Sequence, residues 1–253
     1  MRTARQPGRL LLRDPQDWAA ARLFCFPYSG LGASMYNKWP RRMGDVEICL
    51  IQPPGRENRI REPHFGTYEA FAEQAAERLL PHLDRPFGFF GHCGGVLPAF
   101  ATALHLARNG LPCPDILFVS SQVAPHDGPY GRFLSMTDAE LAEELMQLTR
   151  AMGGLPQPDL IDINLRVLRA DLGASQQYRL EQPVIIPSDI HAIGWRDDRE
   201  IEPALMGGWT SYTEPRRFSQ TILPGGHYDF LRPPEKLLEL LAEGCSAPRG
   251  PRS

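Results

Sequence analysis

The sequence predicts an α/β fold built on a mostly parallel sheet, with helices on both faces and one helical insertion. Short runs rich in β-branched and aromatic residues alternate with longer helical patterns, which is typical of parallel strands joined by crossover helices. One stretch, residues 132–178, shows no strand pattern. With 253 residues and 42% hydrophobic composition, the chain is long enough for one large domain with a full core.

The expected strands are short apolar segments bounded by turn residues. In chain order they are Arg22–Pro27, Val46–Gln52, Phe87–Phe90, Ile116–Ser120, Ile190–Gly194 and Phe218–Leu223. Open α/β sheets place their active sites at the carboxyl ends of the strands. The loops that follow these segments are therefore where functional residues are expected.

Two helices are expected between these strands. Tyr68–Leu80 places Phe71, Ala75 and Leu79 on one helical face. Gly95–Arg108 directly follows the third expected strand and is followed by an Asn-Gly pair, a typical helix stop. Both segments fit crossover helices between parallel strands.

The segment 132–178 is predicted to form amphipathic helices, among them Thr137–Met152 and Ile161–Leu172, with Gly153–Pro156 between them. Its length suits a helical cover over the carboxyl-terminal edge of the sheet. We therefore predict an α/β core made of residues 19–131 and 179–243, interrupted by a helical lid over residues 132–178.

Charge and composition exclude several classes of function. A net charge of −3 and a pI near 6.2 provide no basic surface for nucleic acid, and no apolar run approaches the roughly 20 residues that span a membrane. Met1–Asp14 carries four arginines but lacks the apolar stretch of a secretory signal, so we interpret it as a mobile lead-in to a cytoplasmic protein. The five cysteines form no CxxC pair and no zinc spacing, so no metal is expected.

Cys93 is the most informative residue of the chain. It lies in the segment Phe90–Gly95 (FGHCGG), directly after an expected strand and before an expected helix. Glycines two residues before and two after a nucleophile keep the backbone uncrowded at the strained turn called a nucleophile elbow, where serine is usual. Such a turn raises the side chain above the sheet edge and directs free helix N–H groups at the atom attacked. The alternative is a small buried cysteine in a glycine-rich turn.

Two later loops offer partners for Cys93. Asp197 and Asp198 follow the fifth expected strand, and His227 follows the sixth. The chain order nucleophile, acid, histidine is the one that α/β-hydrolases use. A free thiol is mostly protonated at neutral pH, so an imidazole that takes its proton and a carboxylate that orients the imidazole would activate it for acyl transfer. Position alone does not choose between Asp197 and Asp198.

Three further charged or polar positions receive structural interpretations. Asp171, in the predicted lid, is expected to pair with a nearby arginine. Arg56 and Glu57 are expected to form a local ion pair at a turn. His92, next to Cys93, is expected to point away from the site and to bond a backbone group.

Together these segments resemble a type II thioesterase, the stand-alone α/β-hydrolase that acts on acyl thioesters held by the carrier proteins of polyketide and non-ribosomal peptide synthetases. The resemblance runs from about Leu23 to Leu231. It rests on Phe24–Gly30 (FCFPYSG), Gln52–Glu57 (QPPGRE), Phe89–His92 (FFGH), Leu168–Asp171 (LRAD) and Leu223–His227 (LPGGH). It implies an α/β-hydrolase fold and a thioesterase of natural-product biosynthesis, such as antibiotic production.

Carried over by position, the resemblance makes Cys93 the nucleophile, Asp198 the acid and His227 the base of a catalytic triad. Asp198 is preferred to Asp197 because Ile201 matches the apolar position that follows the acid in the family. The two aspartates differ by one position in register, so this choice depends on the family pattern and not on the chemistry.

The resemblance also implies the surroundings of the nucleophile. The backbone N–H groups of Ser29 and Gly94 would form the oxyanion hole, and residues 132–178 would form a mobile lid. The substrate would arrive on the phosphopantetheine arm of an acyl or peptidyl carrier protein. We therefore expect no cofactor and no metal, no nucleic-acid or membrane partner, and a monomer.

The cysteine at the place of the usual serine leaves the outcome of the reaction open. A serine would convert the thioester into a more stable oxyester that is lost to water, whereas Cys93 conserves a thioester that passes to another thiol at little cost. Hydrolysis that edits or unloads the carrier is one hypothesis, and transfer of an acyl or aminoacyl group between carriers is a second. A non-catalytic carrier-binding relative is a third, and a broken triad would be its mark.

Overall fold

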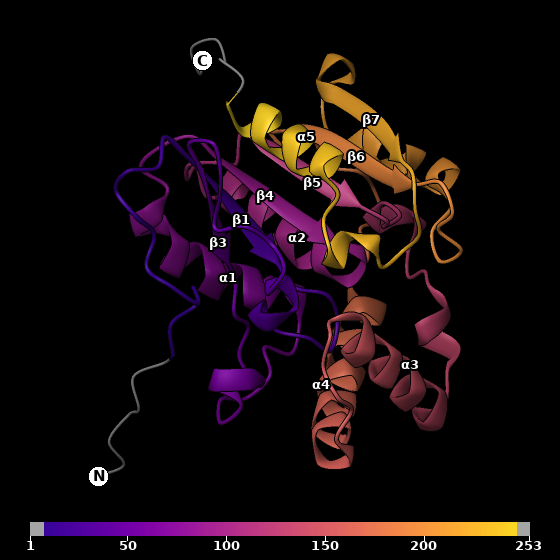
Figure 1. Cartoon of the computed structure of the whole chain (residues 1–253). Helices are drawn as coiled ribbons and strands as arrows, with labels where there is room; N and C mark the ends of the chain where they lie inside the picture. The colour runs from indigo at the N-terminus through magenta and orange to yellow at the C-terminus, as the bar shows by residue number, and fades with distance from the viewer. Residues whose placement is uncertain (1–7, 247–253) are drawn as a thin grey trace.

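A computed structural model describes residues 8–246 and contains a seven-stranded sheet (Figure 1). The strands are β1 (Ala21–Phe26), β2 (Arg42–Met43), β3 (Val46–Leu50), β4 (Phe87–His92), β5 (Ile116–Ser120), β6 (Asp189–Trp195) and β7 (Phe218–Leu223). The helices are α1 (Tyr68–Leu79), α2 (Val96–Arg108), α3 (Asp138–Ala151), α4 (Pro158–Gln177) and α5 (Glu235–Ser246). The strand order is β2-β3-β1-β4-β5-β6-β7, and neighbours are parallel except β2 and β3. The predicted α/β class and mostly parallel sheet are confirmed.

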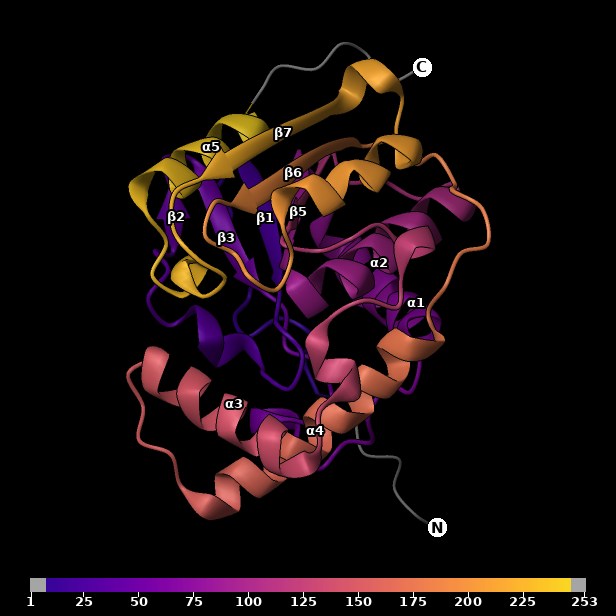
Figure 2. The same cartoon turned by 90° about the vertical axis from the view of Figure 1, so that its right-hand side faces the viewer.

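Alternate residues of the central strand β1 belong to two different cores. Phe24 and Phe26 pack with buried residues of α1 and α2, whereas Leu23 and Cys25 pack with buried residues of α5. Successive side chains of a strand point to opposite faces, so each face of the sheet receives every second residue. Figure 2 shows α5 on one side of the sheet and α1 with α2 on the other. Helices thus cover both faces, as predicted.

α3 and α4 lie side by side beyond the edge of the sheet at which the parallel strands end (Figures 1 and 2). Thr137 caps α3, because its hydroxyl accepts from the Glu140 N–H while the Glu140 carboxylate accepts from the Thr137 N–H. α4 is longer than the predicted Ile161–Leu172 and starts at Pro158, where a helix tolerates the missing N–H. Both predicted helices are present. The boundaries 132–178 for a lid stay a prediction.

The elements that the sequence prediction lacks include β2, the long 3₁₀ segment Pro203–Tyr212 and α5. β2 is only two residues long, and the 3₁₀ segment Pro203–Tyr212 has no α-helical period. α5 does carry a signal, since Leu237 and Leu241 are one helical turn apart and both are buried. Its hydrophobic spacing after a pair of prolines would have been sufficient to predict it.

The N-terminal segment differs from the predicted mobile lead-in. Leu10 and Leu11 are buried, Leu11 forms an antiparallel bridge with Ile51, and the Gln52 N–H donates to the Leu10 carbonyl at 2.7 Å. This part of the chain is packed against the edge of β3. Residues 1–7 lie outside the described residues.

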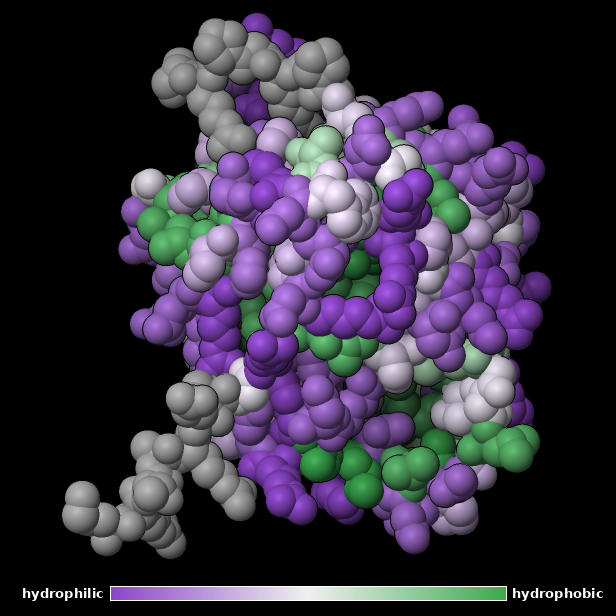
Figure 3. Space-filling model, turned by 60° about the vertical axis from the view of Figure 1, so that its left-hand side comes forward, coloured by the Kyte–Doolittle hydropathy of each residue, from purple (hydrophilic) through white to green (hydrophobic). Residues whose placement is uncertain are grey.

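The surface is mainly polar on the face that Figure 3 shows, with apolar residues in small separate patches. None of the helices within residues 8–246 is long and apolar enough to cross a bilayer. The expectation of a monomer stays a prediction.

Candidate active site

Cys93 lies at a sharp turn between a strand and a helix. β4 ends at His92, a short 3₁₀ turn covers Cys93–Gly95, and α2 starts at Val96. The φ angle of Cys93 is +48°, a left-handed conformation that residues other than glycine rarely adopt. Strain of this kind persists only where the surrounding structure holds it, and it clusters at functional sites. The strand, strained turn and helix have the arrangement of a nucleophile elbow.

Close backbone packing explains the glycines on either side of Cys93. A Cβ atom on Gly91 would lie 2.5 Å from the carbonyl carbon and oxygen of Gly95. A Cβ atom on Gly95 would lie 2.6 Å from the carbonyl oxygen of Phe26 at the end of β1. Because backbone atoms cannot move aside as flexible side chains do, only glycine fits at these two positions.

His227 and Asp198 form a buried hydrogen-bonded pair beside this turn. Nδ1 of His227 lies 2.9 Å from Oδ2 of Asp198, and the two residues are 6% and 5% exposed. Asp198 follows β6 and His227 follows β7, so neighbouring parallel strands bring them together. Asp198 also accepts from Ser121 Oγ at 2.7 Å and from the N–H groups of Glu200 and Ile201 at 2.8 and 3.1 Å. These bonds fix the orientation of the carboxylate, which in turn holds Nδ1 of the imidazole and leaves Nε2 on the opposite side of the ring.

Electrostatics favour the charged forms of this pair. Burial lowers the pKa of His227, but hydrogen bonds with Asp198 and Cys93 outweigh it and raise the pKa to about 10. Burial likewise opposes ionisation of Asp198, yet His227 and Ser121 hold its pKa at about 2. At neutral pH the pair is therefore an imidazolium and a carboxylate. Asp197, the alternative acid, is exposed.

Ser29, in the loop after β1, lies directly against Gly94 of the elbow. A Cβ atom on Gly94 would lie 1.9 Å from Ser29 Oγ and 3.1 Å from the Ser29 backbone nitrogen. Within the part of the chain that the structure describes, the Ser29 N–H has no acceptor and is available to a ligand. The backbones of these two residues thus meet next to Cys93.

Tyr28 and Ser121 contact the pair although the sequence analysis did not single them out. The Tyr28 hydroxyl lies 3.5 Å from Nε2 of His227 and is buried with it. Ser121 directly follows β5 and has a φ angle of +47°, and its hydroxyl donates to Asp198. Both residues follow parallel strands at the carboxyl edge of the sheet. That position is the signal that could have identified them.

His92 contacts the site and does not point away from it, so the expectation from the sequence is wrong. Its buried ring is stacked on Phe230 with centroids 3.8 Å apart and lies 4.7 Å from the ring of His227. Nδ1 of His92 bonds the hydroxyl of Ser120 at 2.9 Å. Burial and the neighbouring charge of His227 lower the pKa of His92 well below its usual value. His92 is therefore a neutral packing partner of His227.

Asp171, on α4 within the predicted lid, pairs with an arginine, as expected. Asp171 is bonded by Arg56, with Nη1 at 2.7 Å from Oδ2 and Nη2 at 2.8 Å from Oδ1. The expectation of a local ion pair between Arg56 and Glu57 is wrong, because the buried Arg56 side chain bonds Asp171. Glu57 instead accepts from the hydroxyl and backbone N–H of Ser34.

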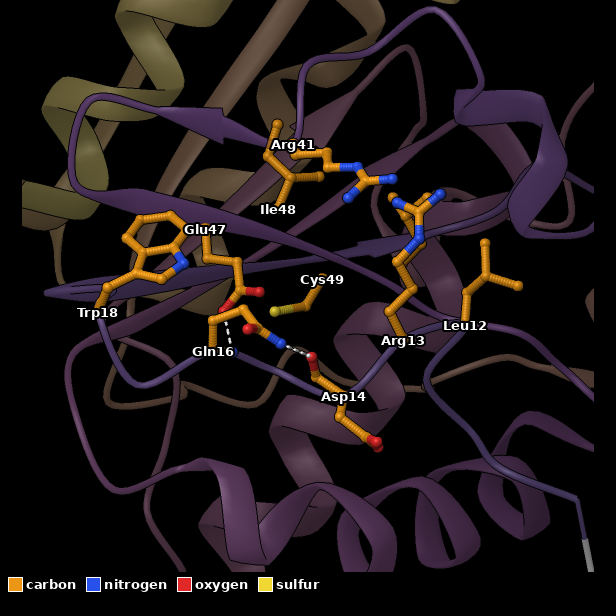
Figure 4. A pocket seen from close by; sticks show the side chains of 10 residues that line it. Leu12, Arg13, Asp14, Gln16, Trp18, Arg41, Glu47, Ile48 and Cys49 are labelled. Carbon is orange, nitrogen blue, oxygen red and sulfur yellow. Dashed lines mark hydrogen bonds between the residues drawn. The ribbon is translucent and has the colours of Figure 1, made fainter.

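A separate cavity of about 300 Å³ lies between the N-terminal segment and β3 (Figure 4). Its lining includes Arg13, Trp18, Arg41, Glu47 and Cys49, and none of the elbow or of the histidine and aspartate pair. Burial raises the pKa of the Cys49 thiol well above its usual value, so this sulfur is not an activated nucleophile. Among the residues that the structure describes, no cluster of three or more His, Cys, Asp or Glu side chains could hold a metal ion.

Comparison with known proteins identifies the family. Residues 21–245 match the Thioesterase family, whose model is described as a thioesterase domain. The chain belongs to the thioesterase family. It is accordingly a thioesterase, an enzyme that cleaves thioesters, and the α/β-hydrolase fold that the resemblance implied is confirmed.

Individual relatives align over nearly the whole chain. Linear gramicidin dehydrogenase LgrE of Brevibacillus parabrevis is 32% identical over 247 residues, which cover 93% of this chain and 92% of that protein. Gramicidin S biosynthesis protein GrsT of Aneurinibacillus migulanus is 32% identical over 235 residues, 89% of each chain. The solved structure of RedJ, a thioesterase from the prodiginine biosynthetic pathway of Streptomyces coelicolor, is 35% identical and has a TM-score of 0.70 over 89% of each chain.

Proposed function

We propose that this enzyme is a type II thioesterase of natural-product biosynthesis, in which a triad of Cys93, His227 and Asp198 hydrolyses acyl thioesters on the phosphopantetheine arm of a carrier protein. The observation that carries the proposal is the buried His227–Asp198 bond of 2.9 Å beside a cysteine held at a φ angle of +48°. The relatives support the pathway, since GrsT is named for gramicidin S biosynthesis and RedJ for the prodiginine pathway. Such an enzyme edits or unloads carriers that hold an unwanted acyl group.

In the first half of the reaction the acyl group moves to the enzyme. The thiol proton of Cys93 passes to Nε2 of His227 before the attack, so the attacking group is a thiolate beside an imidazolium, and its Sγ bonds to the thioester carbonyl carbon. The carbonyl oxygen becomes an oxyanion, which the N–H groups of Ser29 and Gly94 stabilise. His227 then gives this proton to the pantetheine sulfur as the bond between that sulfur and the carbonyl carbon breaks. The products are acyl-Cys93 and a free carrier thiol.

In the second half water releases the acyl group. His227, neutral again, takes a proton from a water molecule that attacks the acyl-Cys93 carbonyl, and the same oxyanion hole is used. Collapse of this second intermediate breaks the carbon–sulfur bond, regenerates the thiol and releases a free acid. Asp198 keeps Nδ1 of the imidazole protonated throughout, so Nε2 faces the reacting atoms in both halves.

The identity of Cys93 favours a second candidate, transfer of the acyl or aminoacyl group to another carrier. Acyl-Cys93 is itself a thioester, so a second phosphopantetheine thiol can replace water as the attacking group with little change in free energy. The intact His227–Asp198 pair speaks against the non-catalytic relative, because a protein that only binds carriers would not need it.

One experiment tests the proposal and separates the two reactions. A carrier is loaded with a radiolabelled acyl group, an excess of a second carrier with a free phosphopantetheine thiol is added, and the label is followed with and without enzyme. Hydrolysis releases free acid at the same rate with or without the second carrier, whereas transfer moves the label onto it. Label that stays on the first carrier in every cognate pair would sink the proposal. Cys93→Ala is the matched inactive control.

A further inference from the structure

Asp171 is buried at the junction between the α3–α4 pair and the sheet, and four donors converge on its carboxylate. Oδ2 accepts from the Gly30 N–H at 2.7 Å and from Arg56 Nη1 at 2.7 Å. Oδ1 accepts from Arg56 Nη2 at 2.8 Å and from His64 Nε2 at 2.7 Å. His64 has a defined tautomer, because its Nδ1 accepts from a backbone N–H two residues later. Each oxygen of the Asp171 carboxylate thus accepts two hydrogen bonds from within the protein.

This network joins α4 to the loop that carries Ser29. Gly30 follows Ser29 directly and has a φ angle of +78°. A Cβ atom on Gly30 would lie 2.9 Å from Cβ of Leu168, one turn before Asp171 on α4. The loop is therefore held from the same helix by a hydrogen bond and by direct packing. Ser29, Gly94, Arg56 and Asp171 also line one small cavity, so the network borders the proposed oxyanion hole.

Arg56 is not free to bind a substrate anion. Besides its two bonds to Asp171, Nη1 donates to the Leu31 carbonyl at 3.1 Å and Nε donates to the Pro54 carbonyl at 3.4 Å. Both Arg56 and Asp171 are only 3% exposed. A buried ion pair is a weak source of net stability, since desolvation offsets most of its attraction. What it does specify is geometry, because a bidentate arginine and carboxylate tolerate little movement.

We propose that Asp171 is a positioning residue, which sets the Ser29 N–H of the oxyanion hole through its bond to the Gly30 N–H and so couples that hole to α4. This inference rests on the proposed function, in which Ser29 binds the oxyanion. The network does not touch His227 or Asp198. Loss of Asp171 should therefore weaken stabilisation of the oxyanion and leave activation of the Cys93 thiol intact.

Two reactions of Cys93 separate these effects. Acylation by an acyl-carrier thioester passes through an oxyanion, whereas alkylation by iodoacetamide is a displacement at carbon that needs the activated thiol but no oxyanion hole. For Asp171→Asn we expect acylation to fall roughly 10- to 100-fold, somewhat less than removal of an oxyanion-hole donor, with alkylation unchanged within about twofold. The loss should appear in kcat and not in KM, because the oxyanion forms only after the substrate has bound.

Arg169→Ala is the matched control. Arg169 lies on the same helix and bonds the exposed Asp138 at 2.6 Å within the α3–α4 pair, without reaching the Ser29 loop. Both reactions should stay near wild type in this variant. If Asp171→Asn does not fold, the double variant Asp171→Asn, Arg56→Gln removes the buried arginine charge that would be left without a partner. Acylation and alkylation of Cys93 are then measured in the double variant, and acylation alone should fall.

The outcomes are distinct. Acylation that falls alone supports the positioning role. Acylation and alkylation that fall together in a folded variant, or acylation that does not change, overturn it while leaving the proposed function standing. A wild-type protein that is alkylated at Cys93 but never acylated by any carrier thioester overturns the proposed function, and this inference with it.

Discussion

Replacing Asp198 with asparagine should disable His227 without moving it. In the present structure Oδ1 of Asp198 accepts from two backbone N–H groups, while Oδ2 accepts from Ser121 Oγ and is the nearer oxygen to His227 Nδ1, at 2.9 Å against 3.1 Å for Oδ1. An asparagine oxygen would keep the two backbone bonds, so its NH₂ group would take the place of Oδ2. That group donates to Nδ1 and thereby places the imidazole proton on Nε2, the atom that has to receive the proton of Cys93.

The size of the effect follows from this exchange. An imidazole held in the wrong tautomer loses most of its value as a base, so the rate of Cys93 acylation should fall roughly 10³- to 10⁴-fold, which corresponds to about 4–5 kcal/mol. Ser121→Ala removes one of the four donors to the carboxylate and leaves the tautomer unchanged. A hydrogen bond to a charged group contributes about 1.5–3 kcal/mol. Ser121→Ala should therefore lower the rate of Cys93 acylation by roughly 100-fold at most.

The assay is the initial rate of acyl release from a loaded carrier, with the acyl-enzyme followed by intact-mass spectrometry. Asp197→Asn is the control, because Asp197 is the exposed neighbour of the same type and its replacement should change the rate by less than about twofold. A folded Asp198→Asn variant that keeps more than about a tenth of the wild-type rate, or an Asp197→Asn variant that is the more damaged, would refute the reasoning.

Three further predictions concern stability and are measured by chemical denaturation. The pKa of His227 is raised from an unfolded value near 6.5 to about 10, so its pairing stabilises the fold fully below about pH 6.5 and is lost as pH rises through 10. The stability advantage of wild type over His227→Gln should therefore shrink across that range, and a constant difference would contradict the ion pair. Gly94→Ala would place Cβ 1.9 Å from Ser29 Oγ and should destabilise the fold by about 1–3 kcal/mol. A second change, Ser29→Gly, should restore part of the lost stability. If it does not, this clash is excluded as the cause. Gly173→Ala, inside α4 with nothing within 4 Å of the new Cβ, should instead stabilise by about 0.5–1 kcal/mol, and a loss would contradict the open surroundings.

The elements that the sequence predicts well are those whose signal is local. The run Ile116–Ser120 has the bounds of β5, and the predicted Tyr68–Leu80 differs from α1 by one residue. The FGHCGG segment predicts its own turn, because the same few residues supply both the strain and the glycines that relieve crowding. Periodicity and turn chemistry act over a few residues, and so a single sequence contains them.

The contacts that the sequence could not predict join distant parts of the chain. Arg56 and Asp171 are 115 positions apart, and no pattern near Arg56 indicates a partner other than the adjacent Glu57. The choice between Asp197 and Asp198 depends on which carboxylate the fold buries against His227, and two adjacent aspartates are chemically the same in the sequence. The position of His92 depends on Phe230, which stacks on its ring, and on His227, whose ring meets it edge-on; both lie more than a hundred positions away in the sequence.

The most direct test of the central claim is detection of the acyl group on Cys93. The enzyme is mixed with an acylated carrier protein, quenched in acid at early times, and analysed by intact-mass and peptide mass spectrometry. The proposed mechanism predicts the mass of one acyl group on the peptide that contains Cys93, and neither this adduct nor turnover in a Cys93→Ala variant that folds normally. An acyl group on any other residue, or turnover by Cys93→Ala at a rate close to that of wild type, would contradict it.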